Sequence, residues 1–236
     1  MNLPSQMETS LLSLHIGQVT DFAPDGRQSA IHKQPVLGPL RLTRLGLADD
    51  AQADLLHHGG PDKALHHYPR EHYENWRDEL EQQATLFVPG GFGENLSTHT
   101  LTEQVVCVGD VFKLGTALVQ VSQGRKPCWK LNVRFGVADM AQRVQDLGRT
   151  GWYYRVLEPG EVAVGDALTL MERPCRDWSL ARVWHLLYQT PADLDALASL
   201  AGLETLAQGW RDMARNRLAT GRAENFQQRL RRVLRG

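Results

Sequence analysis

Residues 116–131 read TALVQVSQGRKPCWKL, a stretch in which a regular pattern stops at a basic turn. Apolar and polar residues alternate through residues 116–122, which predicts a β-strand. Gly124 and Pro127 then interrupt the pattern, because glycine favours turns and proline lacks the N–H that a strand needs. Cys128 is therefore expected on a turn at the end of this strand.

Three basic residues, Arg125, Lys126 and Lys130, surround Cys128 in the sequence. Nearby cations favour the thiolate over the thiol, and the thiolate is both the nucleophile and the soft metal ligand. A free cysteine is more commonly a small buried hydrophobic residue. Two interpretations of Cys128 stay open at this point, a reactive thiolate or a core residue.

The composition is that of an ordinary globular protein, with 236 residues, 42% hydrophobic and 22% charged. The net charge of -1 provides no global field that would direct the chain to nucleic acid or a membrane. Three cysteines without a C-x-x-C pair argue against a disulfide framework and favour a reducing compartment. We find neither a signal peptide nor a membrane span, so a cytoplasmic location is expected.

Charge is unevenly distributed along the chain. Residues 173–236 hold eleven arginines, no lysine and six acidic residues, a net charge of +5, which leaves -6 for residues 1–172. Such a shift predicts a boundary between a first domain, residues 12–172, and a second domain, residues 173–236.

The second domain is predicted to consist of three helices. Apolar residues recur at helical spacing in residues 178–187, in a segment that begins at Pro191 and ends near Gly202, and in residues 203–217. Three short helices with a basic surface suggest a helix-turn-helix DNA-binding function. The same charge is more commonly a solvated face or a docking surface for an acidic partner, and nucleic-acid binding is not the favoured interpretation.

The first domain is predicted to be mainly β. Residues 106–114 and 162–170 resemble each other, and each is interpreted as strand, Gly-Asp turn and strand, with the aspartate bonding its local backbone. Several short strands with regular turns indicate a barrel or sandwich. Residues 85–88 are predicted to form a further strand, and helices are predicted at residues 139–147 and after Pro69.

Four histidines lie within eleven residues around the segment HGGPDKA at residues 58–64. A zinc site is one interpretation, but the spacing across a Gly-Gly-Pro loop is poor and no cysteine accompanies it. An anion-binding loop is another, in which Gly59 and Gly60 present backbone N–H groups and Lys63 adds positive charge. The third is a polar loop with incidental histidines.

Residues 91–97, GFGENLS, form the remaining informative stretch. Their glycines do not fit G-x-G-x-x-G and no βαβ unit surrounds them, so a Rossmann site is excluded. Either Gly93 allows close approach to a ligand that Glu94 and Asn95 contact, or the segment is an ordinary turn. Cys107, within an apolar strand, is expected in the core, and no role is assigned to Cys175.

Three of these motifs, in this order, resemble the MOSC domain (molybdenum cofactor sulfurase C-terminal domain): HGGPDKA at residues 58–64, GENL at residues 93–96, and residues 123–131 with their Pro-Cys pair. The resemblance is closest to the YiiM-like subfamily and covers residues 12–230. It implies a closed β-barrel core with a few covering helices and a small C-terminal three-helix domain. It also implies that the core binds molybdenum cofactor (molybdopterin), with the Cys128 thiolate as a ligand of molybdenum.

Related proteins reduce N-hydroxylated compounds, including base analogues such as hydroxylaminopurine, so the resemblance implies this activity here. The residues that it implies around the cofactor are His58, Gly59, Gly60, Lys63, Gly93, Glu94, Asn95, Arg125, Lys126 and Lys130. Protonation of the leaving oxygen would use His58, Asp62 or His67, and the sequence does not rank them. We find no flavin or iron–sulfur motif, so a separate flavin reductase is expected to supply electrons.

Two other functional classes stay open at this stage. A sulfur carrier would hold a persulfide on Cys128 for assembly of a metal centre. A DNA-binding regulator would use the basic C-terminal helices.

Overall fold

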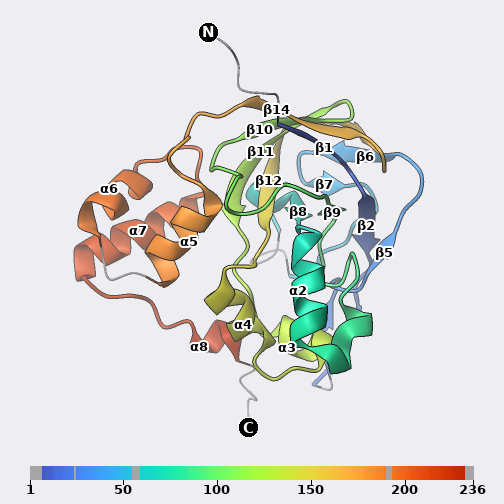
Figure 1. Cartoon of the computed structure of the whole chain (residues 1–236), viewed down its shortest axis with the longest axis horizontal. Coiled ribbons are helices and arrows are strands. Elements are labelled where there is room, and N and C mark those ends of the chain that lie inside the picture. The colour runs from blue at the N-terminus through green and yellow to red at the C-terminus, as the bar shows by residue number, and fades with distance from the viewer. Residues whose placement is uncertain (1–6, 24, 55–58, 190–192, 232–236) are drawn as a thin grey trace.

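The computed structural model describes residues 7–23, 25–54, 59–189 and 193–231. A curled β-sheet forms its centre, one group of helices covers the lower end of the sheet in Figure 1, and a second helical group lies beside it. The fold is therefore mainly β with a helical C-terminal part, as the sequence predicts.

Among the described residues the main sheet has nine strands, and neighbouring strands are antiparallel apart from β8 and β9, which are parallel. In spatial order the strands are β1 (Glu8–Ser10), β14 (Ala167–Glu172), β10 (Val111–Leu114), β11 (Ala117–Gly124), β12 (Trp152–Glu158), β8 (Leu65–His67), β9 (Leu96–Ser97), β2 (Ser13–Gly17) and β5 (Lys33–Pro35). Two small sheets accompany it: β13 (Gly160–Val162), β6 (Leu40–Thr43) and β7 (Gly46–Leu47), and the pair β3 (Thr20–Asp21) and β4 (Gln28–Ser29).

The closed barrel that the sequence predicts is not confirmed. The strand order ends with β1 on one side and β5 on the other, so the sheet curls without closing as a strand ladder. Between β1 and β2 the chain turns away from regular pairing. There the Leu11 N–H donates to the Asp166 carbonyl at 2.8 Å, while the Leu12 N–H donates to the Ser97 carbonyl at 3.0 Å.

The strand expected before Cys128 is β11, and it is the longest in the sheet. It pairs with β10 on one side and β12 on the other. Val119 and Val121 are fully buried, whereas Leu118 and Gln120 are half-buried, as the alternating pattern requires. From Val121 to Gly124 every residue is buried, because the helical group covers this end, and the Ala207 N–H donates to the Ser122 carbonyl at 2.8 Å.

A second apolar core lies at the lower end of the sheet, between α2 (Glu71–Glu79), α3 (Lys130–Phe135) and α4 (Met140–Leu147). The helices expected after Pro69 and at residues 139–147 are thus confirmed. The strand predicted at residues 85–88 is wrong: the chain forms the 3-10 helix η2 (Glu81–Leu86) and then turns. Phe87 enters this core and stacks on Phe135 at 4.7 Å between ring centroids, so packing overrides the strand preference of the segment.

Both Gly-Asp segments are turns held by the aspartate, as predicted. Asp110 Oδ2 accepts the Cys107 N–H at 2.9 Å, and Asp166 Oδ2 accepts the Ala163 N–H at 2.8 Å. The hairpin expected at residues 106–114 is wrong in its first half, which forms only an isolated bridge between Cys107 and Ser179. These residues bond instead to the start of the helical group.

The C-terminal helices are α5 (Leu180–Tyr188), α6 (Leu194–Ala201) and α7 (Gln208–Thr220), followed by the short α8 (Gln227–Leu230). Ser179 caps α5 by accepting the Arg182 N–H, and Asp193 caps α6 by accepting the Ala196 N–H. The helix start expected at Pro191 lies outside the described residues.

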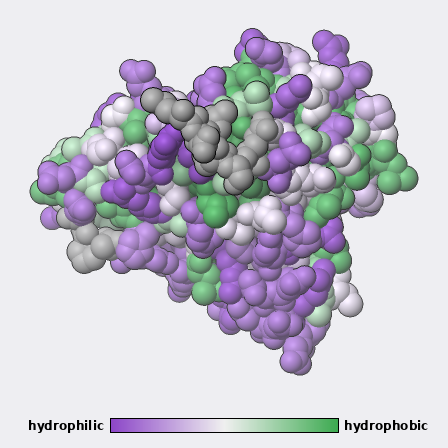
Figure 2. All heavy atoms as spheres, turned by 45° about the horizontal axis from the view of Figure 1, so that its top comes forward, coloured by the Kyte–Doolittle hydropathy of each residue, from purple (hydrophilic) through white to green (hydrophobic). Residues whose placement is uncertain are grey.

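On the face drawn in Figure 2, hydrophobic residues form separate patches within a mostly hydrophilic surface. None of the helices in the described ranges combines the length and the apolar character needed to cross a membrane.

Candidate functional site

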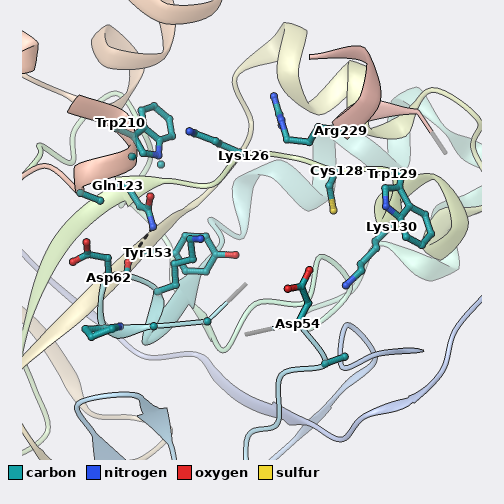
Figure 3. A pocket seen from close by; sticks show the side chains of 18 of the residues that line it. Asp54, Asp62, Gln123, Lys126, Cys128, Trp129, Lys130, Tyr153, Trp210 and Arg229 are labelled. Carbon is teal, nitrogen blue, oxygen red and sulfur yellow. Dashed lines mark hydrogen bonds between the residues drawn. The ribbon is translucent and has the colours of Figure 1, made fainter. Parts of the chain in front are cut away.

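A cavity of about 1130 Å³, called the outer cavity below, lies where β11 ends and the helical group meets the sheet. Figure 3 shows side chains from several distant segments converging on it. Its wall comprises Gly26, Arg27, Gln28, Ala53, Asp54, Gly59, Gly60, Pro61, Asp62, Lys63, Gln123, Gly124, Lys126, Cys128, Trp129, Lys130, Tyr153, Ala207, Gln208, Gly209, Trp210, Gln228 and Arg229. Residues more than 100 positions apart therefore build one site.

Cys128 is presented to the cavity by the irregular segment between β11 and α3. The strand ends at Gly124, where a Cβ would lie 3.2 Å from the Trp210 ring, so this close approach favours glycine. The segment then passes through Pro127, and α3 begins at Lys130. Cys128 is 8% exposed, and Figure 3 shows its Sγ directed into the space beside Tyr153 and Lys130.

A smaller space of about 90 Å³, called the inner recess below, lies on the other side of Cys128. Lys33, Asp50, His66, Asn95 and Arg125 are among its wall residues. The residues that line both spaces are Ala53, Asp54, Lys63, Cys128, Lys130 and Tyr153. The thiol thus lies at the junction of a large cavity and a small polar recess.

Arg125 brings an unsatisfied buried donor to the inner recess. Its backbone N–H donates to the Gly151 carbonyl at 3.0 Å, and the residue is only 6% exposed. Its buried Nη1 has no hydrogen-bond partner among the described residues. A buried cationic donor without a partner is costly, so this geometry suits an anionic ligand in the recess.

Lysine side chains make the outer cavity electropositive. The pKa of Lys126 is lowered to about 8, first by burial and then by the positive charges of Arg229 and Lys63. The Lys126 amine lies over the Trp210 ring, 5.1 Å from its centroid, in a cation–π contact. Burial also lowers the pKa of Lys63. A bound anion would relieve this crowding of cations.

Burial shapes the aromatic side of the site as well. The pKa of Tyr153 is raised, first because burial disfavours the phenolate. Its ring lies 4.9 Å from the ring of His66, whose pKa burial lowers well below the ordinary value, with the charge of Arg125 acting in the same direction. Both groups are therefore neutral near pH 7.

The structure brings most of the first-motif residues to the cavity. Gly59, Gly60, Asp62 and Lys63 line it, and the 3-10 helix η1 (Pro61–Lys63) places them there. His58 lies outside the described residues. The Asp62 carboxylate is bound by Arg155 at 2.8 Å, so it holds the loop as well as facing the cavity.

The second motif divides between the recess and the protein interior. Gly93, at φ 77°, and Asn95 line the inner recess. Asn95 Oδ1 accepts the His66 N–H at 3.0 Å, and Asn95 Nδ2 donates to Asp50 at 2.8 Å. Glu94 is fully buried and lines neither space.

Glu94 has partners that explain its position. Its carboxylate accepts hydrogen bonds from the Tyr73 hydroxyl, from the Gly90 N–H at 2.6 Å and from the Phe92 N–H at 3.1 Å. Such a set of donors holds the loop together and leaves the side chain directed away from both spaces. The structure therefore assigns Glu94 a structural position rather than one at the ligand site.

His67 also lies away from both spaces. Its ring nitrogens are each 3.0 Å from a hydroxyl, of Tyr154 and of Thr98, and burial lowers its pKa to about 3. The ring is neutral and sealed in the core, so the structure provides no path for it to protonate a substrate.

Several site residues were missed by sequence reasoning, namely Lys33, Asp50, Tyr153, Trp210 and Arg229. Tyr153 belongs to an apolar strand and carries no local signal of function. Trp210 and Arg229 reach the cavity from helices about 80 and 100 residues after Cys128. The excess of arginine in the C-terminal part was the only sequence signal for either residue, and it does not single out Arg229 as part of the site.

The other two cysteines differ from Cys128. Burial and the Asp110 carboxylate raise the pKa of Cys107 to about 11, consistent with its predicted place in the core. Cys175 is half-buried, with its Sγ 3.5 Å from Thr205 Oγ1. In the described ranges, no group of three or more His, Cys, Asp or Glu side chains could hold a metal ion.

Two family models match this chain. Residues 54–169 match the model described as MOSC domain, and residues 178–221 match the model described as YiiM-like, 3-alpha helix domain. Protein YiiM of Escherichia coli (strain K12) is 43% identical over 219 residues, which cover 93% of this chain and 97% of that protein. The crystal structure of YiiM from Escherichia coli is similar with a TM-score of 0.82 at 38% identity, covering 96% of this chain and 100% of that one.

A fungal protein named Reductase, from Gibberella moniliformis (strain M3125 / FGSC 7600), is 36% identical over 217 residues. The match covers 91% of this chain and 38% of the fungal protein. The chain therefore belongs to the MOSC domain family, in the branch that carries a YiiM-like three-helix domain.

Proposed function

We propose that this protein is a molybdenum-cofactor-dependent oxidoreductase that reduces N-hydroxylated compounds, such as base analogues of the hydroxylaminopurine type. Membership of the MOSC family and similarity to a protein named Reductase support the reaction class. The observation that carries the proposal is the position of Cys128, a thiol at the junction of a basic cavity and a polar recess.

The residues of the site fit molybdopterin. This cofactor is an anionic phosphate ester whose dithiolene binds the metal, so the protein needs to supply a soft thiolate and donors for an anion. Cys128 would hold the metal. Arg125, whose Nη1 has no partner in the part of the chain that the structure describes, and the lysines 63, 126 and 130 would balance the negative charge. When bound, the cofactor supplies two-electron oxygen-transfer chemistry.

The protein's own part is to bind and orient the substrate and to deliver protons. The overall reaction is R–NH–OH + 2 e⁻ + 2 H⁺ → R–NH₂ + H₂O, so two protons and two electrons have to enter the site. Asp62 lines the outer cavity as a carboxylate paired with Arg155, whereas His67 is sealed in the core, so of these two only Asp62 could relay a proton from solvent to the substrate. A separate flavin reductase would supply the electrons.

Metal content and catalysis test the proposal together. We expect protein produced in a molybdenum-replete host to contain molybdenum and to reduce hydroxylaminopurine with a reduced electron donor, and Cys128→Ser to lose both properties. Cys107→Ser is the matched control, because Cys107 lines neither space. Unchanged metal content and activity in Cys128→Ser would overturn the mechanism.

A second candidate, a sulfur carrier, is favoured by the same position of Cys128 in the wall of both spaces. Such a protein would carry sulfane sulfur on Cys128 without metal. Mass spectrometry of protein isolated without reductant distinguishes the two, because a persulfide adds one sulfur atom to the peptide that contains Cys128.

The arginines of the helical part give no comparable support to DNA binding. Arg217 is bound by Glu224 at 2.9 Å, and Arg229 is directed to the Cys128 segment. These two guanidiniums are engaged within the protein.

A further inference from the structure

The segment after α7, residues 222–231, returns from the helical group to the Cys128 segment, and we call it the C-terminal strap. The match to the YiiM-like three-helix model ends at residue 221, so the strap lies outside both matched segments. Figure 1 shows its helix α8 beside α3 and α4, separated from α5, α6 and α7. Gln228 and Arg229 form part of the wall of the outer cavity.

Arg229 binds the backbone on both sides of Cys128. Its Nη1 donates to the Pro127 carbonyl, directly before the cysteine. Its own carbonyl accepts the Trp129 N–H, directly after the cysteine, at 2.8 Å. A single residue therefore fixes both peptide groups that flank the thiol. It does so over a long distance in the sequence, since Pro127 lies 102 residues before Arg229.

The strap is itself held firmly at this point. Leu230 is 1% exposed in the apolar core that also contains Phe135, and its carbonyl accepts Asn132 Nδ2 at 2.9 Å. On the other side, Phe226 packs on Tyr188 at 4.8 Å between ring centroids. These contacts fix the position of the strap, and Arg229 in turn fixes the backbone on both sides of the cysteine.

Arg229 could instead be one more cation for an anionic ligand, but both of its terminal nitrogens already donate to protein groups. Nη2 donates to Gln145 Oε1 at 2.7 Å, while Nη1 donates to the Pro127 carbonyl. Arg125 differs, because its buried Nη1 lacks a partner among the described residues. The guanidinium of Arg229 is therefore arranged to hold protein groups, and Arg125 to receive a ligand.

We propose that Arg229 is a positioning residue that holds the Cys128 thiol at the junction of the outer cavity and the inner recess. The inference rests on the proposed function only in taking Cys128 as the functional group. Its test uses cofactor-free protein, so that loss of molybdenum chemistry and loss of positioning give different results.

The first measurement is the alkylation rate of Cys128 by iodoacetamide, resolved by residue with mass spectrometry. We expect Arg229→Ala to raise the limiting alkylation rate at alkaline pH about fivefold or more. Loss of one hydrogen bond of ordinary strength, about 1 kcal/mol, raises the population of open segment conformations by about this factor. Arg229→Lys keeps the charge, but a single amine does not reproduce the fork that bonds Pro127 and Gln145 together. The alkylation rate of Cys128 is therefore also expected to rise in this variant. Labelling of Cys175 in the same samples is the internal reference.

The second measurement is amide hydrogen exchange of the peptide that contains Trp129. Its protection is expected to fall in Arg229→Ala and in Gln145→Ala, because loss of a guanidinium contact loosens the strap that carries the residue 229 carbonyl, the acceptor of the Trp129 N–H that both variants keep. Arg222→Ala is the matched control, because Arg222 lies in the same strap, is exposed and is not part of either wall. Should Arg229→Ala fail to fold, Gln145→Ala and Arg229→Lys carry the test.

The two proposals fail in different ways. If the folded Arg229 and Gln145 variants show the alkylation rate and the amide exchange of the wild type, the proposal that Arg229 positions Cys128 is overturned, whatever the metal content of the protein. Faster alkylation in a protein whose wild type never binds molybdenum would support positioning and overturn the proposed function.

Discussion

Lys33 and Asp50 form a buried ion pair in the wall of the inner recess. The Lys33 amine lies 2.6 Å from both carboxylate oxygens of Asp50, and the two side chains are 8% and 3% exposed. Asp50 also accepts the Gly17 N–H at 2.7 Å and Asn95 Nδ2 at 2.8 Å. The pair therefore links four segments of the chain around the recess.

Removing one partner of this pair is expected to destabilise the protein strongly. Asp50→Ala leaves a desolvated ammonium group, which costs about 3–5 kcal/mol of unfolding free energy. The double variant with Lys33→Met should recover only part of this loss, because no unpaired buried charge remains but the Gly17 N–H and Asn95 Nδ2 still lack their acceptor. Urea unfolding followed by tryptophan fluorescence measures both.

An exposed pair serves as the control. Arg143 and Asp139 form an ion pair at 3.0 Å with side chains 44% and 55% exposed, so Asp139→Ala should cost no more than about 1 kcal/mol. Equal costs for Asp50→Ala and Asp139→Ala would contradict the importance of burial.

Gly151 supports the Cys128 segment through a backbone geometry that only glycine allows. At φ 67°, an added Cβ would lie 2.2 Å from the His67 carbonyl oxygen, and the Gly151 carbonyl accepts the Arg125 N–H. Gly151→Ala should therefore lower the melting temperature sharply. Gly136→Ala, at φ 65° with nothing within 4 Å, should cost only about 1–2 kcal/mol. Similar melting temperatures for the two variants would show that the clash is relieved.

Glu94 should affect stability through the loop that it holds. Burial raises its pKa, while the Tyr73 hydroxyl and two backbone N–H groups favour the carboxylate. Glu94→Ala leaves these buried donors without an acceptor, which costs about 1–3 kcal/mol for each group. Glu74→Ala, at an exposed position on α2, should stay within about 0.5 kcal/mol of wild type. A Glu94→Ala protein of wild-type stability with altered ligand affinity would instead favour a direct role in binding.

Buried histidines should make the fold sensitive to mild acid. Burial lowers the pKa of His15 to about 4 and of His67 to about 3, against 6.5 for the free group. Between pH 6.5 and these values the unfolded chain binds protons that the folded chain does not, so stability falls as pH falls. Each such histidine contributes up to about 1.4 kcal/mol per pH unit. His67→Gln should reduce the slope between pH 6 and 5 by about this amount in urea titrations, and an unchanged slope would contradict the prediction.

Local patterns in the sequence were sufficient for much of the fold. The alternation before Gly124 gave β11, the helical spacing gave α2, α4 and the C-terminal helices, and the aspartates of the Gly-Asp pairs bond their own turns. The strand expected at residues 85–88 failed because Phe87 belongs to a tertiary core. Closure of the sheet depends on how distant short strands meet, which no local pattern records.

The candidate site was predictable only in its local part. Cys128 and its basic neighbours could be recognised because they lie within six residues of one another. Gly59, Gly60 and Lys63 could be recognised because paired glycines stand close to a positive charge. Glu94 looked equally available, since a sequence does not show that Tyr73 and two backbone N–H groups surround it. Trp210 and Arg229 were invisible as site residues because their contacts with the thiol segment arise only through tertiary folding.

The hydrogen bonds from Arg229 also have a consequence for the order of events during synthesis. The peptide groups beside Cys128 emerge from the ribosome 102 residues before the side chain that secures them. At about 5–20 residues per second, this interval lasts on the order of 5–20 seconds. Throughout it the thiol is present on a loop without its downstream anchor, so the backbone around Cys128 is secured only after the strap has been synthesised.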